Sequence, residues 1–173
     1  MPRPKSSSNP DSGFTVLTPE LARLRSPGTL LFAVGNVSSG DDGAGPALLR
    51  QLRGKTVLRL LDGGDMPENV AHRALEPKPD AILLVDAADF GREPGFCALI
   101  SPEEIGGQTV SSHGLSLSAL VKFLKLSLPS CEIALLCIQV QDMRPGRSGL
   151  SVPVSHSVRR LSRLLSYEKQ QGI

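Results

Sequence analysis

A chain of 173 residues with 40% hydrophobic content is long enough to form one domain with a core of ordinary size. Its 19 Lys and Arg residues nearly balance 17 Asp and Glu residues, and a formal net charge of +2 provides no strong field for nucleic acid or an anionic membrane. No segment has the apolar length of a membrane span or a secretory signal, so we expect a cytoplasmic protein with no membrane insertion and no nucleic-acid partner.

The first 27 residues are rich in proline, serine and charged side chains, and only the patch FTVLTPELARL is apolar enough to pack. Such a composition is typical of a segment that buries too little apolar surface to order itself. We therefore expect residues 1–27 to form a loosely ordered N-terminal extension and residues 28–173 to form a single α/β domain.

From residue 28 onward, apolar runs alternate with helix-like segments. In chain order, TLLFAV precedes 46–52, TVLRLL precedes 67–75, AILLVDA and the shorter FCALI precede 115–128, and EIALLCIQV precedes 155–167. Three of these runs, TLLFAV, AILLVDA and EIALLCIQV, are continuously apolar, which is typical of strands covered on both faces. The pattern predicts a three-layer α/β fold, with a twisted, mostly parallel sheet of about five strands and helices on both faces.

None of the three cysteines, Cys97, Cys131 and Cys137, are spaced as a CxxC pair. Two of them lie in or beside the apolar run CEIALLCIQV. We interpret all three as reduced thiols of the core, in preference to metal ligands or a disulfide.

The loop VGNVSSGDDGAGP, residues 34–46, follows the first strand and leads into a helix, the position at which many folds bind a phosphate. Its four glycines lack the G-x-G-x-x-G spacing, it has no P-loop lysine, and Asp41 and Asp42 occupy its mouth. A negative charge about 4 Å from a phosphate costs several kcal/mol at the effective dielectric constant of a protein surface. We therefore expect no nucleotide cofactor, and a nucleotide-binding domain is a disfavoured alternative.

One aspartate is enough to cap the helix that follows this loop, and two carboxylates together attract a cation. The loop by itself leaves capping and cation binding equally open. Asp86 directly follows a buried-type strand, so we expect it at the carboxyl end of the sheet, where open α/β folds bind ligands. It faces Asp42 if its strand lies beside the first one.

His113, in the segment SSHGLSL just before a helix, would add an imidazole to these carboxylates. A mixed oxygen and nitrogen set suits Zn, Ni, Fe or Mn, and the ligand types alone do not choose among them. The other two histidines, His72 and His156, lie in predicted helices and are interpreted as structural or solvated.

Four blocks in order, VGNVSSGDDGAGP, LDGGDMPEN, LLVDAADFGREPG and SSHGLSL, resemble the hydrogenase maturation proteases, in particular the branch that processes hydrogenase-3-type large subunits. The resemblance covers residues 30–141. It implies an endopeptidase that removes the C-terminal extension of a [NiFe]-hydrogenase large-subunit precursor after nickel has been inserted. The implied partner is that precursor, and the implied metal is nickel presented by the substrate.

The resemblance also implies roles for individual residues. The family positions that recognise nickel correspond to Asp42, Asp86 and His113, the same three residues that the residue types select. Of these, Asp42 and Asp86 are the expected catalytic carboxylates. The expected substrate-binding residues are Gly40, Asp41, Asp62 and Gly63.

Two alternatives use the same residues for another task. A metal-dependent hydrolase of a different substrate would hold its own metal ion. A nickel-sensing binding protein would recognise the precursor without cutting it.

Overall fold

A computed structural model of the chain describes residues 10–101, 110–111 and 114–167. The helices are α1 (Pro10–Leu24), α2 (Ala44–Leu52), α3 (Gly114–Ser127) and α4 (Val152–Leu165), with the short 3₁₀ helices η1 (Gly40–Gly43), η2 (Pro67–Asn69) and η3 (Ala71–Ala74). The strands are β1 (Thr29–Val34), β2 (Arg59–Gly64), β3 (Ala81–Asp89), β4 (Cys97–Ile100), β5 (Val110–Ser111) and β6 (Glu132–Gln139).

The strands form one sheet with the order β2-β1-β3-β6-β4. Neighbours are parallel from β2 to β6, whereas β4 runs antiparallel to β6 and the short β5 pairs antiparallel with β3. The predicted, mostly parallel sheet is therefore confirmed. Because β2 lies on one side of β1 and β3 lies on the other, the strand order reverses between β1 and β3. Open α/β sheets bind ligands at this position.

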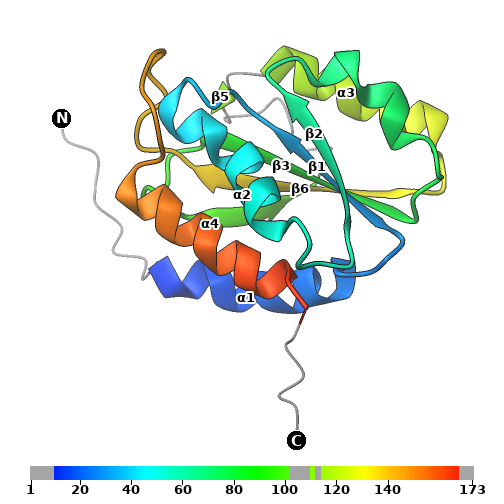
Figure 1. Cartoon of the computed structure of the whole chain (residues 1–173), viewed down its shortest axis with the longest axis horizontal. Coiled ribbons are helices and arrows are strands. Elements are labelled where there is room, and N and C mark those ends of the chain that lie inside the picture. Colours follow the sequence, from blue (N-terminus) through cyan, green and yellow to red (C-terminus); the bar gives the residue numbers. More distant parts are fainter. Residues whose placement is uncertain (1–9, 102–109, 112–113, 168–173) are drawn as a thin grey trace, which may run out of the picture.

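Helices cover both faces of this sheet, as the continuous apolar strands predict. On one face, α1, α2 and α4 pack in the core with Leu31, Leu83 and Val85. On the other face, α3 and η3 pack with Phe32 and Leu84, and Figure 1 shows α3 on the side of the sheet away from α1 and α4. The central strands β1, β3 and β6 alternate their side chains between two buried layers, so they are apolar along most of their length.

The N-terminal segment differs from the loosely ordered extension expected for residues 1–27. Residues 10–24 form α1, and its Leu17, Leu21 and Leu24 are buried in the same core as α2 and α4. These leucines recur at the four- and three-residue spacing of one helix face. The surrounding prolines and serines obscure this stripe, and Pro19 lies inside the helix although proline usually ends one.

The end of α1 also holds the last turn of α4. The Arg25 guanidinium donates hydrogen bonds to the carbonyls of Leu164 and Ser166, at 3.1 and 2.9 Å. The Thr56 hydroxyl donates to the carbonyl of Leu165 at 2.6 Å. Carbonyls that a helix end leaves without intrahelical partners are thus satisfied by two other segments of the chain.

The segment 67–75, expected to be helical, contains two short 3₁₀ helices, η2 and η3, in place of an α-helix. It packs its small residues Ala71 and Ala74 into the layer that α3 occupies. Among the helices in the described part of the chain, none has both the length and the apolar character needed to cross a membrane.

Replacing Leu21 by alanine tests the packing of α1. Leu21 is fully buried, so Leu21→Ala should lower the free energy of unfolding by about 2–5 kcal/mol, measured by urea denaturation. Leu126→Ala is the control, because Leu126 is 75% exposed on α3 and its truncation should change stability by less than about 0.5 kcal/mol. Equal stability of the Leu21→Ala variant and the wild type would contradict a packed α1.

Candidate functional site

The carboxyl ends of β1 and β3 lie side by side, which the sequence left open, and Asp86 lies inside β3 rather than directly after it. The two strands pair in parallel register up to Ala33 and Val85, and Asp86 is the next residue of β3. After β1 ends, the chain enters η1, which carries Asp42 and packs against β3. The structure thus brings the segments that carry Asp42 and Asp86 together at the point where the strand order reverses.

The glycines of the loop after β1 allow a close approach of main chains. Gly35 has a φ of +137°, and a Cβ placed on it would lie 1.9 Å from the carbonyl oxygen of Asp42. A Cβ on Gly45 would lie 2.4 Å from the carbonyl oxygen of Val34 and 3.0 Å from that of Val85. These glycines therefore pack the loop and the start of α2 onto the ends of β1 and β3, which explains a glycine-rich loop without phosphate.

Asp42 is held firmly in this loop and is 2% exposed. Its carboxylate accepts a hydrogen bond from the backbone N–H of Asn36 at 2.9 Å, and its own N–H donates to the Ser39 carbonyl at 3.2 Å. A buried carboxylate needs such donors or a cation to offset the loss of hydration. Its position at the sheet end and its fixed backbone suit Asp42 to bind a positively charged group.

Asp86 is fully buried, at the register position opposite Cys137 of β6. Burial first, and then the nearby Asp86 carboxyl group, raise the pKa of the Cys137 thiol well above its ordinary value. Because the thiolate is the reactive form, Cys137 is unsuited to act as a nucleophile although it lies near a candidate catalytic acid. Because side chains alternate along β3 and Leu84 lies in the layer shared with α3, the Asp86 side chain points into that same layer.

The other two cysteines also have raised pKa values. Burial raises the pKa of Cys97 to about 12, and burial followed by the charge of Asp80 raises the pKa of the half-buried Cys131. All three cysteines are free thiols. The interpretation as reduced thiols agrees with this structure.

Asp41, expected to contact substrate, points into the protein. It is fully buried, and its carboxylate accepts hydrogen bonds from the backbone N–H groups of Gln141, Asp142 and Ser151 and from the Ser151 hydroxyl. These donors belong to residues 141–151, the connection between β6 and α4, which we name loop 141–151. Asp41 therefore offers its carboxylate to loop 141–151, and this placement differs from the expected substrate contact.

Of the remaining expected substrate-binding residues, two are buried and one is exposed. Gly40 and Gly63 are buried, and a Cβ on Gly63 would lie 2.6 Å from the Phe32 ring, so both glycines serve close packing in this structure. Asp62 is exposed at the carboxyl end of β2, where its carboxylate accepts the Gly64 N–H at 3.1 Å. Of these residues, Asp62 alone presents its side chain to solvent beside the loop of Asp42. The hydrogen bond to Gly64, two residues later, is a common turn interaction of aspartate and is a second explanation for this residue.

His113 lies outside the described residues. Gly114, the next residue, begins α3, whose Leu117 and Leu120 pack in the layer that Asp86 faces. Within the described ranges, no group of three or more His, Cys, Asp and Glu side chains has an arrangement able to hold a metal ion. The described histidines, His72 and His156, are both exposed.

The structure adds Gln139, which the sequence did not single out. At the end of β6, its buried side-chain carbonyl accepts the N–H groups of Phe90 and Arg92 at 2.9 and 3.1 Å. Its amide donates to the Asp89 carboxylate at 3.1 Å. Gln139 thus fixes the loop that follows β3. The only signal in the sequence is an amide side chain closing a continuously apolar strand.

Loop 141–151 also borders a hollow of about 670 Å³ at the start of α4. Two arginines on this loop, Arg144 and Arg147, pair with Asp142 at 2.7 and 3.0 Å. The hydrogen bond from Arg144 is the main cause that lowers the pKa of Asp142 to about 2. The hollow lies next to the loop of Asp42 because Asp41 joins the two segments.

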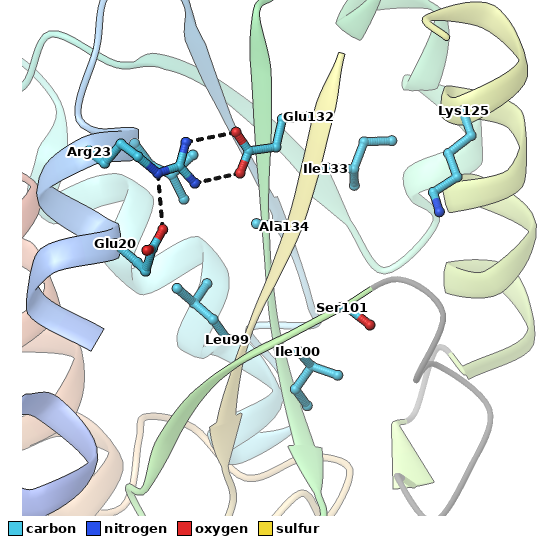
Figure 2. A pocket seen from close by; sticks show the side chains of 10 residues that line it. Glu20, Arg23, Leu99, Ile100, Ser101, Lys125, Glu132, Ile133 and Ala134 are labelled. Carbon is cyan, nitrogen blue, oxygen red and sulfur yellow. Dashed lines mark hydrogen bonds and ion pairs between the residues drawn. The ribbon is translucent and has the colours of Figure 1, made fainter. Parts of the chain in front are cut away.

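A second hollow, of about 470 Å³, lies between α1, β4, β6 and α3 at the opposite end of the parallel strands. Arg23 of α1 lies on its rim beside Glu132 and Glu20 (Figure 2). Its guanidinium donates hydrogen bonds to Glu132 at 2.5 and 2.7 Å and to Glu20 at 3.0 Å. This pairing lowers the pKa of Glu132. The hollow is lined mainly by apolar side chains and saturated ion pairs, and neither candidate acid borders it.

Comparisons with known proteins identify a family that this chain resembles. The family model described as hydrogenase maturation protease matches residues 46–167, a span that includes Asp86 and His113 and begins just after Asp42. The hydrogenase 3 maturation protease of Escherichia coli K12 is 36% identical over 115 residues, covering 64% of this chain and 71% of that protein.

Solved structures of hydrogenase maturation proteases have a fold similar to this chain. A [NiFe] hydrogenase maturation protease HycI from Thermococcus kodakarensis superposes with a TM-score of 0.73 at 27% identity, covering 86% of this chain and 95% of that one. The solution structure of the endopeptidase HycI from Escherichia coli gives a TM-score of 0.69 at 29% identity, covering 79% and 88%.

Thiol labelling tests the chemistry around Asp86. At pH 8, a disulfide reagent should modify Cys131 slowly in the native protein, and Cys97 and Cys137 only after unfolding, because burial raises the pKa of both core thiols. Labelling is followed by absorbance and located by mass spectrometry. The Cys131→Ser variant should show no reaction in the native state, and rapid labelling of Cys137 would contradict the buried arrangement beside Asp86.

Proposed function

The chain belongs to the hydrogenase maturation protease family and is a peptidase, and we propose that it cuts the C-terminal extension from a [NiFe]-hydrogenase large-subunit precursor once nickel has been inserted. The observation that carries this proposal is the arrangement of two acids at the sheet's switch point. Asp42 lies in η1, which follows β1 and packs against β3, and Asp86 lies in β3, the parallel neighbour of β1. Two carboxylates at one such position are suited to a cation.

In this proposal the cation is nickel that the precursor already carries, so it is part of the substrate. Asp42 and Asp86 supply oxygen ligands, and His113 supplies a nitrogen ligand. Imidazole suits nickel well, and the precursor's own thiolates complete the metal's surroundings. The protease therefore recognises the nickel together with the chain that holds it.

Electrostatics explains why cleavage waits for nickel. Asp42 and Asp86 are both buried, and two carboxylates in one low-dielectric site repel each other. A bound cation offsets this repulsion and anchors the precursor, so the peptide bond to be cut is held in a fixed place. A nickel-free precursor lacks the anchor, and its tail is not positioned for reaction.

The chemical step is hydrolysis of one peptide bond. Water adds to the carbonyl carbon while a carboxylate accepts its proton, and the same proton then passes to the leaving nitrogen as the C–N bond breaks. The products are a shortened large subunit with a new carboxylate and a released tail with a new amine. Water is the favoured attacking group because the raised pKa keeps the Cys137 thiol protonated.

Incubation with matched precursors tests the proposal directly. The purified full chain is mixed with nickel-loaded or nickel-free large-subunit precursor, and loss of the tail is followed by mass spectrometry. We expect cleavage of the nickel-loaded form alone, because only that form offers the cation. Equal cleavage of both forms would contradict nickel gating, and stable binding of both without any product would favour a non-cleaving partner.

The Asp42→Ala variant tests the site in the same assay. It should reduce cleavage of the nickel-loaded precursor to background while the protein stays folded by circular dichroism. The matched control is Asp65→Ala, because Asp65 is an exposed acid in the loop after β2 and should leave cleavage within about twofold of the wild type. A folded Asp42→Ala variant that cleaves at the normal rate would remove Asp42 from the site.

A further inference from the structure

We propose that Asp41 is a positioning residue, which ties η1 to loop 141–151 and thereby fixes the direction in which Asp42 presents its carboxylate to nickel. The inference rests on the proposed function of Asp42. It assigns the first acid of the pair a task of its own, because the buried carboxylate of Asp41 accepts hydrogen bonds from four donors of loop 141–151.

The carboxylate of Asp41 is saturated by donors from one distant segment. One oxygen accepts the N–H groups of Gln141 and Asp142 at 2.8 and 3.0 Å and the Ser151 hydroxyl at 2.9 Å. The other oxygen accepts the Ser151 N–H at 2.6 Å. Hydrogen bonds to an ionised group are the strong ones, so this cluster holds loop 141–151 firmly against η1.

The same carboxylate completes the start of α4. Ser151 is the N-cap residue of α4, yet its hydroxyl forms no cap within its own helix and bonds to Asp41. The helix has no acidic residue in its first turn. Asp41 therefore supplies the negative charge that stabilises a helix N-terminus, from a position 110 residues earlier in the chain.

Main-chain hydrogen bonds from Asp41 and from Gly40, the residue before it, reinforce the connection. The N–H of Asp41 donates to the Asp142 carbonyl at 2.9 Å, and the N–H of Gly40 donates to the Arg147 carbonyl at 2.8 Å. Gly40 has a φ of +57°, and a Cβ there would lie 2.5 Å from the Asp142 carbonyl oxygen. The first turn of η1 and loop 141–151 thus form a single packed unit.

Because Asp41 and Asp42 are adjacent in η1, the hydrogen bonds of Asp41 also determine the direction of the Asp42 side chain. A 3₁₀ helix has about three residues per turn, so adjacent side chains point roughly 120° apart. With Asp41 directed into loop 141–151, Asp42 is directed to a different side, where the Asn36 N–H meets it at 2.9 Å. Rotation of η1 would break the bonds of Asp41 and move the carboxylate of Asp42 together.

The variant Asp41→Asn isolates this role. It keeps the shape of the side chain but replaces one acceptor oxygen by an NH₂ group, which then faces an N–H donor. A residue that only stabilises the fold, here called a brace, and a residue that positions Asp42 predict different changes in the affinity for precursor. Loss of a brace weakens binding of nickel-loaded and nickel-free precursor alike, whereas a displaced Asp42 weakens only the preference for the nickel-loaded form.

The measurement is therefore a ratio of dissociation constants, nickel-free over nickel-loaded precursor, for the full chain. We expect Asp41→Asn to lower this ratio roughly tenfold, as for groups that support metal-binding residues. Adding Asp41→Asn to Asp42→Asn should change the ratio no further, because the first residue acts through the second.

Two serine variants complete the test. Ser151→Ala removes one of the bonds to Asp41 and should lower the ratio by about two- to fivefold. It also carries the test if Asp41→Asn fails to fold. Ser166→Ala is the matched control at the other end of α4, where the hydroxyl bonds to the Ser162 carbonyl at 2.6 Å, and the ratio should stay unchanged.

The outcomes separate the two proposals. A wild-type ratio near one would remove nickel recognition itself and this inference with it. A normal wild-type ratio that neither Asp41→Asn nor Ser151→Ala changes would overturn the positioning role alone. An equal loss of affinity for both precursor forms would also overturn it, because that result describes a brace.

Discussion

Burial of the acid pair after β1 is the constraint on which the rest of this site depends. Asp41 and Asp42 are adjacent in η1, and both are almost completely buried. Carboxylates cannot be removed from water without donors or a cation. The fold satisfies Asp41 with the N–H groups of loop 141–151 and the start of α4, and it places Asp42 at the end of the sheet.

This constraint links elements that are far apart in the chain. The position of α4 determines the donors available to Asp41, and α4 is itself held at its far end by Arg25 and Thr56. The N-terminal helix α1 packs its leucines beside α4 in the same core. An element outside the family-model match thus helps to hold the helix that supports the acid loop.

Much of the architecture could be predicted from residue patterns because those patterns act locally. Continuous apolar strands indicated a sheet covered on both faces, and the run before Asp86 indicated its place beyond the end of β1, although Asp86 lies inside β3 rather than after it. Composition misled at α1, because the prolines and serines around Leu17, Leu21 and Leu24 obscure a helical stripe that is stable only when packed. The segment 67–75 was likewise helical in pattern and became two short 3₁₀ helices under a packed layer.

The sequence by itself determined the class of fold and the family to which the four blocks belong, and it predicted Asp42 and Asp86 as candidate site residues. The tertiary structure alone decided that β1 and β3 are neighbours and that Asp41 and Asp42 face different surroundings. It also decided that Gly40 and Gly63 pack against other segments. The physical reason is that strand order and hydrogen-bond partners join residues up to 110 positions apart, whereas a sequence pattern reports only the spacing of near neighbours.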